Sequence, residues 1–381
     1  MVPSPEELLA LAEGAHDAAV AILGPTVAED DEHERFRKEA FAALGEAGLC
    51  GVPTEERHGG LGMGYLAYVH VLEAIARVSP SYAVSVAVNG LPQVILKEFG
   101  TEAQCEAWLP KLASGRALGA FALSEPESGS DAASLRTTAR RDGGAWVLDG
   151  TKFWITHGGV ADVYVVMART GGEGPGGISA FLVPADTPGL SFGKKEAKMG
   201  LRASPTVELI LEGARIPEAH LLGREGEGFR VAMQALDSGR ITIAATSVGL
   251  AQSALDVAVR YAAQRKQFGQ AIIDFQGVGF MLADMACRVE TGRLLVHKAA
   301  TLKDAGAVFS PTAAMAKLVA TDNAMAVTTD AVQVLGGYGY TREYPVERMM
   351  RDAKVMQIVE GTNQVQRLVI ARHLRRSVAG R

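Results

Sequence analysis

The fold class is decided by the stretch Gly172-Glu173-Gly174-Pro175-Gly176-Gly177-Ile178-Ser179-Ala180-Phe181-Leu182-Val183. Its first six residues match the G-x-G-x-x-G pattern of dinucleotide-binding loops, in which glycines lead from a strand into a helix. Here the glycines lead into the apolar run 178–183, which is β-rich and predicts a strand. The stretch therefore predicts a flexible hairpin loop rather than a doubly wound dinucleotide fold. A bound dinucleotide would need a different kind of binding site.

The predicted secondary structure of the segments around this hairpin changes along the chain. Between about 121 and 226, β-rich runs recur at 146–148, 163–167 and 207–211, and Asp149-Gly150 is expected to turn the chain. Residues 5–118 and the chain from 229 onward show helical spacing of apolar residues, and Pro311 and the loop Gly336-Gly337-Tyr338-Gly339 are expected to break the later helices. This order predicts an α+β fold in which a β unit is inserted between two α units.

Composition and charge argue against several classes of protein. The net charge is -5 and the pI about 6.0, with scattered Lys and Arg, so nucleic-acid binding is not expected. No apolar run reaches the roughly 18 to 20 residues that span a bilayer, so membrane insertion is not expected. Because no basic residue precedes Arg35, the N-terminus does not resemble a signal peptide, and a cytoplasmic location is expected. Cys50, Cys105 and Cys287 form no Cys-x-x-Cys pair, so no disulfide framework or metal site is predicted, and they are interpreted as small buried hydrophobic residues.

Two segments of the β unit carry side chains suited to a planar or phosphate-bearing ligand. The first, 124–131, reads Ser-Glu-Pro-Glu-Ser-Gly-Ser-Asp and can offer several donors, although an ordinary surface turn has the same composition. In the second, Trp154 and Thr156 lie two residues apart on one side of a predicted strand, where they could address one ligand. A tryptophan such as Trp154 is more often a core residue than a cofactor contact, and His157 is more often a satisfied or solvated side chain than a metal ligand.

Two further segments lie at the ends of predicted helices. Thr362 is a candidate N-cap for the helical run that follows it, which places Glu360 beside a helix start. Glu360 is then either a carboxylate favoured by the helix dipole or a general base on a glycine-flanked turn. The segment 265–269, Arg-Lys-Gln-Phe-Gly, reads as a C-terminal helix cap, or Arg265 could pair with a phosphate.

Together these segments resemble the acyl-CoA dehydrogenase family, and the match runs through nearly the whole chain in the family's order and spacing. The motifs that carry it are Ala122-Leu123-Ser124-Glu125 with Ser128-Gly129-Ser130-Asp131, Trp154-Ile155-Thr156, Arg265 to Gly269, Gln333-Val334-Leu335-Gly336-Gly337 and Glu360-Gly361-Thr362. The resemblance implies an N-terminal all-α domain over 1–119, a central β-barrel-like domain over 120–226 and a C-terminal four-helix domain over 227–381. The last domain would pack into a homotetramer, a dimer of dimers.

The resemblance also implies FAD bound without a Rossmann fold. One set of residues would line the flavin of its own subunit: Phe121, Leu123, Ser124, Gly129, Ser130, Trp154, Ile155 and Thr156. A second set would contact the FAD of a neighbouring subunit: Arg265, Phe268, Gln276, Gln333, Val334, Gly336 and Gly337. Thr362 and Gln364 would complete that site. His157 and Gln267 depart from the commonest family residues at their positions.

For the reaction, the resemblance implies that Glu360 removes the α-proton of an acyl-CoA thioester while the β-hydride passes to FAD, giving a trans-2-enoyl-CoA. Ser130, Asp237, Arg240 and Gly361 would meet the substrate, and reduced FAD would pass electrons to electron-transfer flavoprotein. Some relatives carry the base at the position of Gly239, which offers no carboxylate here.

The resemblance is strongest to short-chain, butyryl-CoA type enzymes. A dicarboxylic substrate is not expected, because Val78 to Leu96 contains no Lys, Arg or His to meet a second carboxylate. Two rival functions stay open at this point: an acyl-CoA oxidase-like flavoprotein that reoxidises with oxygen, and a non-catalytic acyl-CoA-binding scaffold.

Overall fold

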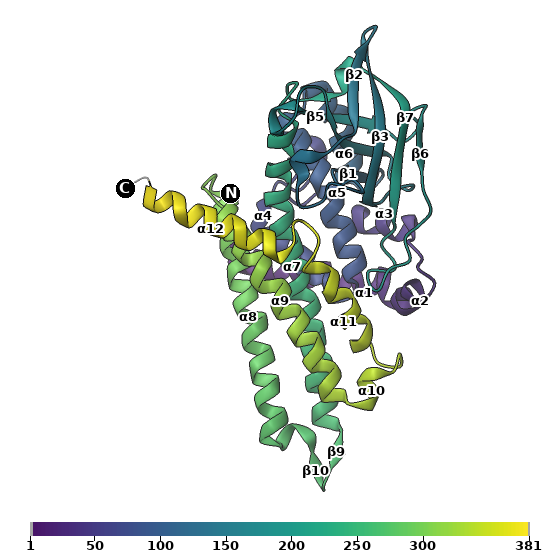
Figure 1. Ribbon diagram of the computed structural model, residues 1–381. Helices are drawn as coiled ribbons and strands as arrows, with labels where there is room; N and C mark the ends of the chain where they lie inside the picture. The colour runs from purple at the N-terminus through teal and green to yellow at the C-terminus, as the bar shows by residue number, and fades with distance from the viewer. Residues whose placement is uncertain (1–2, 380–381) are drawn as a thin grey trace.

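The computed structural model describes residues 3–379, and the chain forms three regions in sequence order (Figure 1). Helices come first, a sheet follows, and a long helical bundle ends the chain, which confirms the predicted α+β order. The N-terminal helices are α1 Pro5–Leu23, α2 Val27–Glu32, α3 Lys38–Glu46, α4 Gly64–Ala76, α5 Pro80–Phe99 and α6 Glu102–Ala113. Capping boxes start α1 and α6: the side chains of Ser4 and Thr101 accept from the amides of Glu7 and Gln104, whose side chains accept in return.

The central region is an eight-stranded sheet with neighbours in the order β6-β7-β3-β2-β4-β5-β8, and β1 pairs with β4 in parallel. Its strands are β1 Gly119–Ala122, β2 Thr138–Asp142, β3 Ala145–Thr156, β4 Val163–Arg169, β5 Ile178–Pro184, β6 Leu190–Phe192, β7 Thr206–Pro217 and β8 Leu221–Leu222. β4 and β5 form the antiparallel hairpin predicted around the glycine-rich stretch. Their side chains are buried along almost their whole length, so they are the centre of this region.

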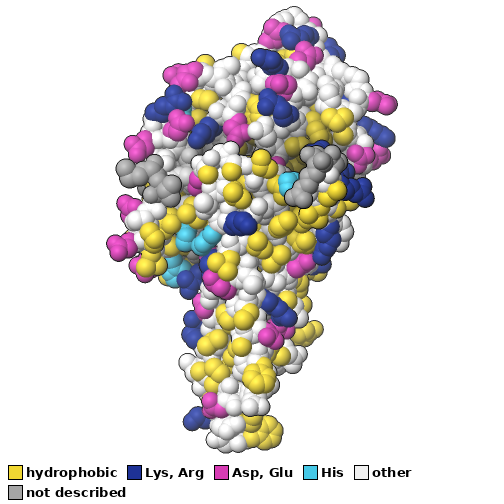
Figure 2. All heavy atoms as spheres, turned by 90° about the vertical axis from the view of Figure 1, so that its left-hand side faces the viewer, with side chains coloured by type: hydrophobic (Ala, Val, Ile, Leu, Met, Phe, Trp, Pro, Cys, Tyr) yellow, Lys and Arg dark blue, Asp and Glu magenta, His cyan; other side chains and the backbone are white. Residues whose placement is uncertain are grey.

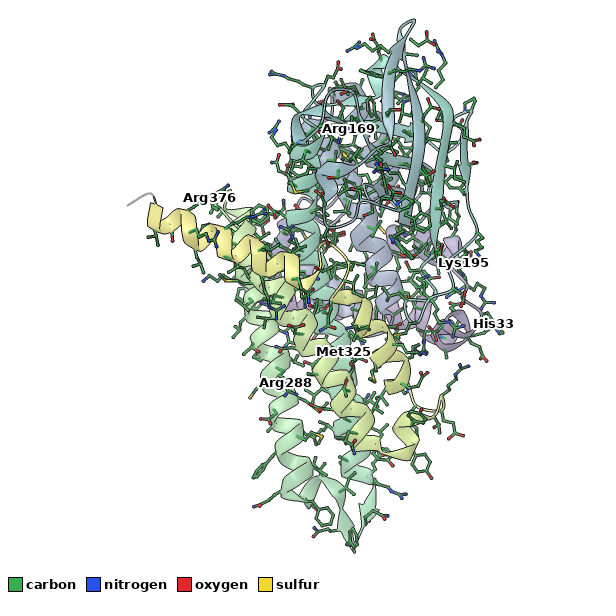
Figure 3. All side chains as sticks on the ribbon, in the orientation of Figure 1. His33, Arg169, Lys195, Arg288, Met325 and Arg376 are labelled. Carbon is green, nitrogen blue, oxygen red and sulfur yellow. The ribbon has the colours of Figure 1, made fainter. Side chains whose placement is uncertain are left out.

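The glycine-rich hairpin loop is anchored by one side chain. The Arg169 guanidinium at the end of β4 donates to the carbonyls of Gly172 and Gly174 at 2.6 and 3.2 Å. The same group binds the carbonyls of Ala133 and Leu135 at 2.8 and 3.0 Å, and so ties the hairpin to the segment before β2 (Figure 3). The loop therefore has a defined partner within its own sheet region.

The C-terminal region is built on three long helices, α7 Gly228–Gln264, α8 Gln276–Asp304 and α9 Ser310–Leu335. A two-residue ladder, β9 Lys266–Gln267 with β10 Gln270–Ala271, joins α7 to α8 at the far end of the bundle (Figure 1). The shorter helices α10 Gly337–Tyr340, α11 Val346–Met356 and α12 Asn363–Ala379 complete the chain. α7 is the axis of the molecule, because it packs on α4 and α5 near the sheet and on α8 and α9 beyond it.

Several local predictions need correction. Asp149-Gly150 does not turn the chain: β3 continues through a register shift, and a Cβ on Gly150 would lie 2.6 Å from the Thr137 hydroxyl. Pro311 starts α9 rather than breaking a helix, as its position in the first turn allows. The 336–339 loop is largely the short helix α10. Cys287 is exposed, whereas Cys50 and Cys105 are buried as predicted.

The expectation about apolar runs also needs correction. Two helical segments, Pro5–Glu32 and α7, are long and apolar enough by length and composition to cross a membrane. Most of the apolar window of α7 is buried inside the protein, as in the core helix of a globular fold. Within residues 3–379, no group of three or more His, Cys, Asp or Glu is placed to hold a metal ion.

Candidate functional site

Glu360 lies on a tight turn between α11 and α12. Its backbone has a φ of 55° and that of Gly361 a φ of 86°, so two successive residues are left-handed. A glutamate rarely adopts this conformation without surrounding contacts that enforce it. The predicted N-cap is confirmed, since the Thr362 hydroxyl accepts from the amide of Val365 at 3.3 Å and α12 starts at Asn363.

Two side chains hold this turn through its backbone, and a third ties the residue at the start of α12 to α9. The Gln366 amide donates to the carbonyls of Glu360 and Gly361 at 3.1 and 2.7 Å. Lys317, fully buried in α9, donates to the Gly361 carbonyl at 3.0 Å and to the Asn363 side-chain oxygen at 2.8 Å. Asn363 in turn donates to Thr321 and Asp322 on α9. The unusual backbone is therefore fixed by α9 and by the first turn of α12.

The carboxylate of Glu360 lies against α7 at Gly239. A Cβ added to Gly239 would be 2.4 Å from Oε2 of Glu360, so a larger residue there would displace the carboxylate. Oε2 is buried and has no hydrogen-bond partner among the described residues. Burial raises the pKa of Glu360 to about 7, and the positive charges of Arg240 and Lys317 oppose this rise. The carboxylate thus has one buried oxygen without a hydrogen-bond partner and a pKa near neutral pH, as a general base requires.

Asp237 and Arg240 lie one turn apart on α7, the helix that the Glu360 carboxylate contacts. The Arg240 guanidinium, 5 % exposed, forms an ion pair with Asp237, and its Nε has no partner within residues 3–379. Ser310, at the start of α9, donates to the Asp237 carboxylate at 2.9 Å. Burial raises the pKa of Asp237, against the effect of the neighbouring Arg240. This pair leaves an unsatisfied donor close to the glutamate.

The 124–131 loop is held to the sheet by a buried ion pair. Lys152 in β3 is fully buried, and its ammonium lies 2.7 Å from the Glu125 carboxylate and 3.1 Å from the Leu123 carbonyl. The other contacts of Glu125 are the amides of Arg136 and Thr137 at 2.6 and 2.9 Å. Burial lowers the pKa of Lys152 to about 8, whereas Lys152 and these amides hold the pKa of Glu125 below its usual range despite burial. The pair therefore stays ionised near neutral pH.

This anchoring leaves the end of the loop open. Gly129 and Ser130 are exposed, and a Cβ on Gly129 would meet nothing within 4 Å. Leu123 is buried, and Phe121 and Ser124 are partly buried, so the start of the loop faces the protein. Residues 129–131 therefore form an exposed surface turn. The donors of this turn face solvent, where a ligand could also bind them.

Trp154 departs from the expected strand geometry. Its φ is 63°, and the register of β3 against β7 shifts between Lys152 and Ile155. The indole is 60 % exposed, so the core interpretation is wrong and an aromatic surface is available to a ligand. Thr156 is partly buried and Ile155 buried. The Phe153 amide donates to the Ser124 carbonyl at 2.8 Å, so β3 and the 124–131 loop form one surface.

His157 forms a hydrogen bond through only one of its two ring nitrogens within the described residues. It is fully buried, and burial lowers its pKa to about 4, so the ring is neutral at physiological pH. Its Nδ1 lies 3.0 Å from the Gly119 carbonyl, which can only accept, so Nδ1 carries the proton. The rings of Phe36 and Phe41 lie on it at 5.6 and 6.0 Å between centroids. His157 therefore joins the N-terminal helices to the sheet.

The second set of predicted cofactor contacts lies at the far end of the bundle (Figure 1). Arg240 and Arg265 are separated by 25 residues of the α7 axis, about 37 Å at roughly 1.5 Å per residue. All of this set except Val334, which is buried, is exposed: Arg265, Phe268, Gln276, Gln333, Gly336 and Gly337. The structure brings the first set together and keeps the second set away from Glu360 within one chain. Gln364, next to Thr362, is exposed.

The comparisons with known proteins cover the whole chain. Family models match the acyl-CoA dehydrogenase N-terminal domain over residues 5–116, the middle domain over 120–214 and the C-terminal domain over 226–375. The mitochondrial short-chain specific acyl-CoA dehydrogenase of Bos taurus is 48 % identical over 379 residues, 99 % of this chain and 92 % of that one.

The chain belongs to the acyl-CoA dehydrogenase family.

Two solved structures have the same fold as this acyl-CoA dehydrogenase. The butyryl-CoA dehydrogenase of Megasphaera elsdenii superposes with a TM-score of 0.96 at 43 % identity, covering 98 % of this chain and 99 % of that one. A chain in a structure described as electron transferring flavoprotein of Acidaminococcus fermentans has a TM-score of 0.96 at 45 % identity, covering 98 % of each chain. The resemblance to butyryl-CoA type enzymes is confirmed, and members of the family are FAD flavoproteins that oxidise a CH–CH bond.

Three residues of the acyl-CoA dehydrogenase site were missed from the sequence: Lys152, Lys317 and Gln366. Two of them left a weak signal, because Lys317 is a lone charge in the run Ala313 to Val319 and Lys152 directly precedes the aromatic motif. A lysine among apolar residues indicates either an edge position or a buried partner. The sequence alone does not distinguish the two.

Proposed function

We propose that this acyl-CoA dehydrogenase removes the α-proton and β-hydride of a short-chain acyl-CoA thioester to give the trans-2-enoyl-CoA, with Glu360 as the base. The observation that carries the proposal is the buried, unpartnered Oε2 of Glu360 in contact with Gly239. That oxygen has lost its hydration and gained no protein donor, so a substrate C–H bond can take the free position. Its raised pKa matches proton abstraction near neutral pH.

The donor set of the chain fits FAD. Trp154 offers an exposed ring, Thr156 and Ser130 offer hydroxyl groups on the same surface, and the 124–131 loop is held rigid by Lys152. When bound, FAD supplies the acceptor for the β-hydride. The chain would hold its own FAD through Phe121, Leu123, Ser124, Gly129, Ser130, Trp154, Ile155 and Thr156.

Substrate binding is assigned to the residues around the base. Arg240 has an unpaired Nε and Asp237 a carboxylate shared with Ser310, so both can meet polar groups of the CoA moiety. The main-chain amide of Glu360 and Gly361 would bind the thioester, and donors to its carbonyl oxygen stabilise the enolate that develops as the α-proton leaves. Ser130, in the 124–131 loop of the sheet region, would contact the same acyl-CoA substrate.

The oligomer follows from the position of the second set of contacts. Because Arg265 lies about 37 Å from Arg240 along α7, the contacts at the far end of the bundle would serve an FAD other than the one beside Glu360 of their own chain. A homotetramer, as a dimer of dimers, would bring Arg265, Phe268, Gln276 and 333–337 to the FAD of a neighbouring subunit, with Thr362 and Gln364 completing it. The proposed domain limits are 1–119, 120–226 and 227–381, the last being the assembly domain. Electron-transfer flavoprotein is the proposed acceptor of the electrons.

The decisive experiment is Glu360→Gln. The variant is expected to bind FAD and butyryl-CoA as the wild type does, but to lose anaerobic flavin bleaching by about 10²- to 10⁴-fold, since the amide cannot accept the α-proton. Stopped-flow absorbance at the flavin band measures this rate. Near-normal bleaching would reject Glu360 as the base.

Two controls separate the rival functions. Rapid reoxidation of the reduced enzyme by air, without electron-transfer flavoprotein, would favour an oxidase. A colourless protein that cannot be loaded with FAD would favour a scaffold. An anaerobic screen with butyryl-, isobutyryl-, isovaleryl-, hexanoyl- and octanoyl-CoA then gives the chain-length preference.

A further inference from the structure

Lys317 is a charged side chain that no part of the proposed chemistry uses. It lies in the middle of α9, is 0 % exposed, and is surrounded along its helix by the buried residues Ala313, Ala316 and Ala320. Burying an unpaired ammonium costs several kcal/mol, so a lysine is retained in such a place only with good partners. Its two partners, the Gly361 carbonyl and the Asn363 side chain, both belong to the turn that carries Glu360.

We propose that Lys317 is a positioning residue for the base: its ammonium holds the Glu360–Gly361 turn and supplies the positive charge that favours the carboxylate form of Glu360. The inference rests on the proposed role of Glu360.

The hydrogen bonds explain the positioning. Glu360 and Gly361 are consecutive left-handed residues, and their carbonyls accept from side chains of α9 and α12. The Glu360 carbonyl accepts from Gln366, and the Gly361 carbonyl accepts from Lys317 and Gln366. Lys317 and Gln366 both donate to the Gly361 carbonyl, so its two lone pairs are filled. Without the ammonium, the turn would keep Gln366 as its only side-chain donor among the described residues. The Glu360 carboxylate would then be free to move away from Gly239.

The positive charge of Lys317 accounts for its proposed effect on the protonation of Glu360. No hydrogen bond or ion pair within residues 3–379 joins Lys317 to the Glu360 carboxylate, so the ammonium acts on the carboxylate through space. The charged groups that face Glu360 are Arg240 on α7 and Lys317 on α9, and Asp322 is the carboxylate that faces Lys317 from its own helix. Arg240 forms an ion pair with Asp237, and its charge acts on Glu360 together with that of Lys317. Burial lowers the pKa of Lys317 to about 7, while the Glu360 charge raises it, so each group favours the charged form of the other.

The test uses the FAD-loaded enzyme and two substitutions. Lys317→Met removes the hydrogen bonds and the charge, and Lys317→Gln removes the charge while keeping a donor of similar length. In both variants the acid limb of the pH profile for flavin bleaching is expected to move up by roughly one pH unit or more, a tenfold loss of carboxylate at the acid end. Only Lys317→Met should also lower the plateau rate at high pH, because only it releases the turn.

A readout independent of turnover is the infrared band of the protonated Glu360 carboxylic acid, identified by its loss in Glu360→Gln. Its titration midpoint is expected to rise in both Lys317 variants. Thr321→Val is the matched control, since it removes a bond from Thr321 to the Asn363 network but no charge. It should lower the melting temperature without moving the midpoint.

An unchanged midpoint in folded Lys317→Gln would overturn the proposed charge effect, and an unchanged plateau in Lys317→Met would overturn the positioning effect. If Lys317→Met does not fold, Lys317→Ala takes its place in the plateau measurement, because it also removes both the donor and the charge, and an unchanged plateau there would overturn the positioning effect. Failure of the proposed function looks different, because Glu360→Gln would then bleach its flavin normally whatever the Lys317 variants do.

Discussion

At the scale of single residues, the site depends on the contact between Glu360 and Gly239. The two residues lie 121 positions apart, yet the carboxylate occupies the space in which a side chain at 239 would stand. The resemblance described above implies that some members of the family carry their base at position 239. The geometry gives a reason: the two positions face the same point, and a carboxylate on one requires a small residue on the other.

Gly239→Ala is the residue-scale prediction. The added Cβ would lie 2.4 Å from Oε2, so the Glu360 carboxylate must move, and a displacement of about 1 Å costs about 10²-fold in rate. We expect a loss of roughly that size in the bleaching rate with normal FAD content, measured by stopped-flow absorbance. Gly14→Ala in α1 is the matched control, because its Cβ would meet nothing within 4 Å. A wild-type rate in Gly239→Ala would contradict the contact.

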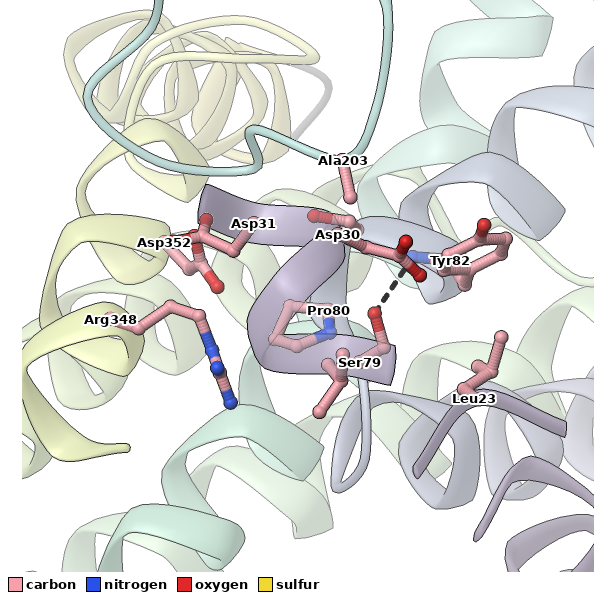
Figure 4. A pocket seen from close by; sticks show the side chains of 11 residues that line it. Leu23, Asp30, Asp31, Ser79, Pro80, Tyr82, Ala203, Arg348 and Asp352 are labelled. Carbon is pink, nitrogen blue, oxygen red and sulfur yellow. Dashed lines mark hydrogen bonds between the residues drawn. The ribbon is translucent and has the colours of Figure 1, made fainter. Parts of the chain in front are cut away.

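At the scale of elements, the turn of Glu360 depends on how α11 is fixed. Asp352 in α11 is 3 % exposed and accepts from the Leu201 amide at 2.6 Å, which ties the helix to the loop before β7. Arg351 binds Asp31 of α2 at 2.8 Å. Asp30, Asp31, Arg348 and Asp352 line a cavity of about 10 Å³ between these elements (Figure 4). α11 therefore joins all three regions of the chain immediately before the base.

Asp352→Asn gives a prediction about pH. Burial raises the pKa of Asp352 to about 7, so the folded protein holds its proton more tightly than the unfolded chain does. This contribution to stability is complete at pH below about 4 and is lost as the pH rises to about 7. Asparagine keeps an acceptor for Leu201 but has no charge to bury. The urea midpoint of the variant should therefore rise relative to the wild type between pH 5 and pH 7.5.

The control for this experiment is Asp17→Asn, whose side chain is 88 % exposed. It should follow the wild type at both pH values. A constant difference between Asp352→Asn and the wild type across the range would show that Asp352 is ionised throughout, or protonated throughout, in the folded protein.

At the scale of the whole molecule, a long, partly apolar bundle extends from a compact body (Figures 1 and 2). Figure 2 shows hydrophobic side chains spread over this face of the bundle. Large apolar residues exposed on the C-terminal region include Phe268, Phe280, Leu294, Leu368 and Leu374. Exposed apolar surface of this extent marks an interaction site, and the proposed tetramer would cover it.

Phe268→Asp tests this assembly. Phe268 is 96 % exposed at the tip between β9 and β10, with a φ of 51°, and a carboxylate there would be desolvated in an interface. We expect a smaller species in sedimentation velocity and a lower flavin-to-protein absorbance ratio, because each FAD would lose contacts from a neighbour. Leu9→Asp, at a 61 % exposed position in α1, is the matched control and should leave both values unchanged. A tetramer with full flavin content in Phe268→Asp would contradict the assignment.

The sequence by itself determined the features that depend on neighbours in the chain. The glycine-rich stretch before Ile178 had to be a hairpin, because no helix follows it, and β4 and β5 confirm this. Thr362 capped α12 as its hydroxyl and position predicted. The α–β–α order followed from periodicity, which each segment shows without reference to the others.

Only the tertiary structure decided the state of the charged groups. Glu360 beside a helix start was compatible with a solvated carboxylate, and its burial against Gly239 requires α7 to be in place. Lys152 and Lys317 are buried because Glu125 and the Glu360 turn meet them from distant parts of the chain. The bulge that exposes Trp154 likewise depends on pairing with β7. Local patterns set elements through bonds between residues a few positions apart, whereas burial, and with it the pKa of Glu360, depends on which elements pack together.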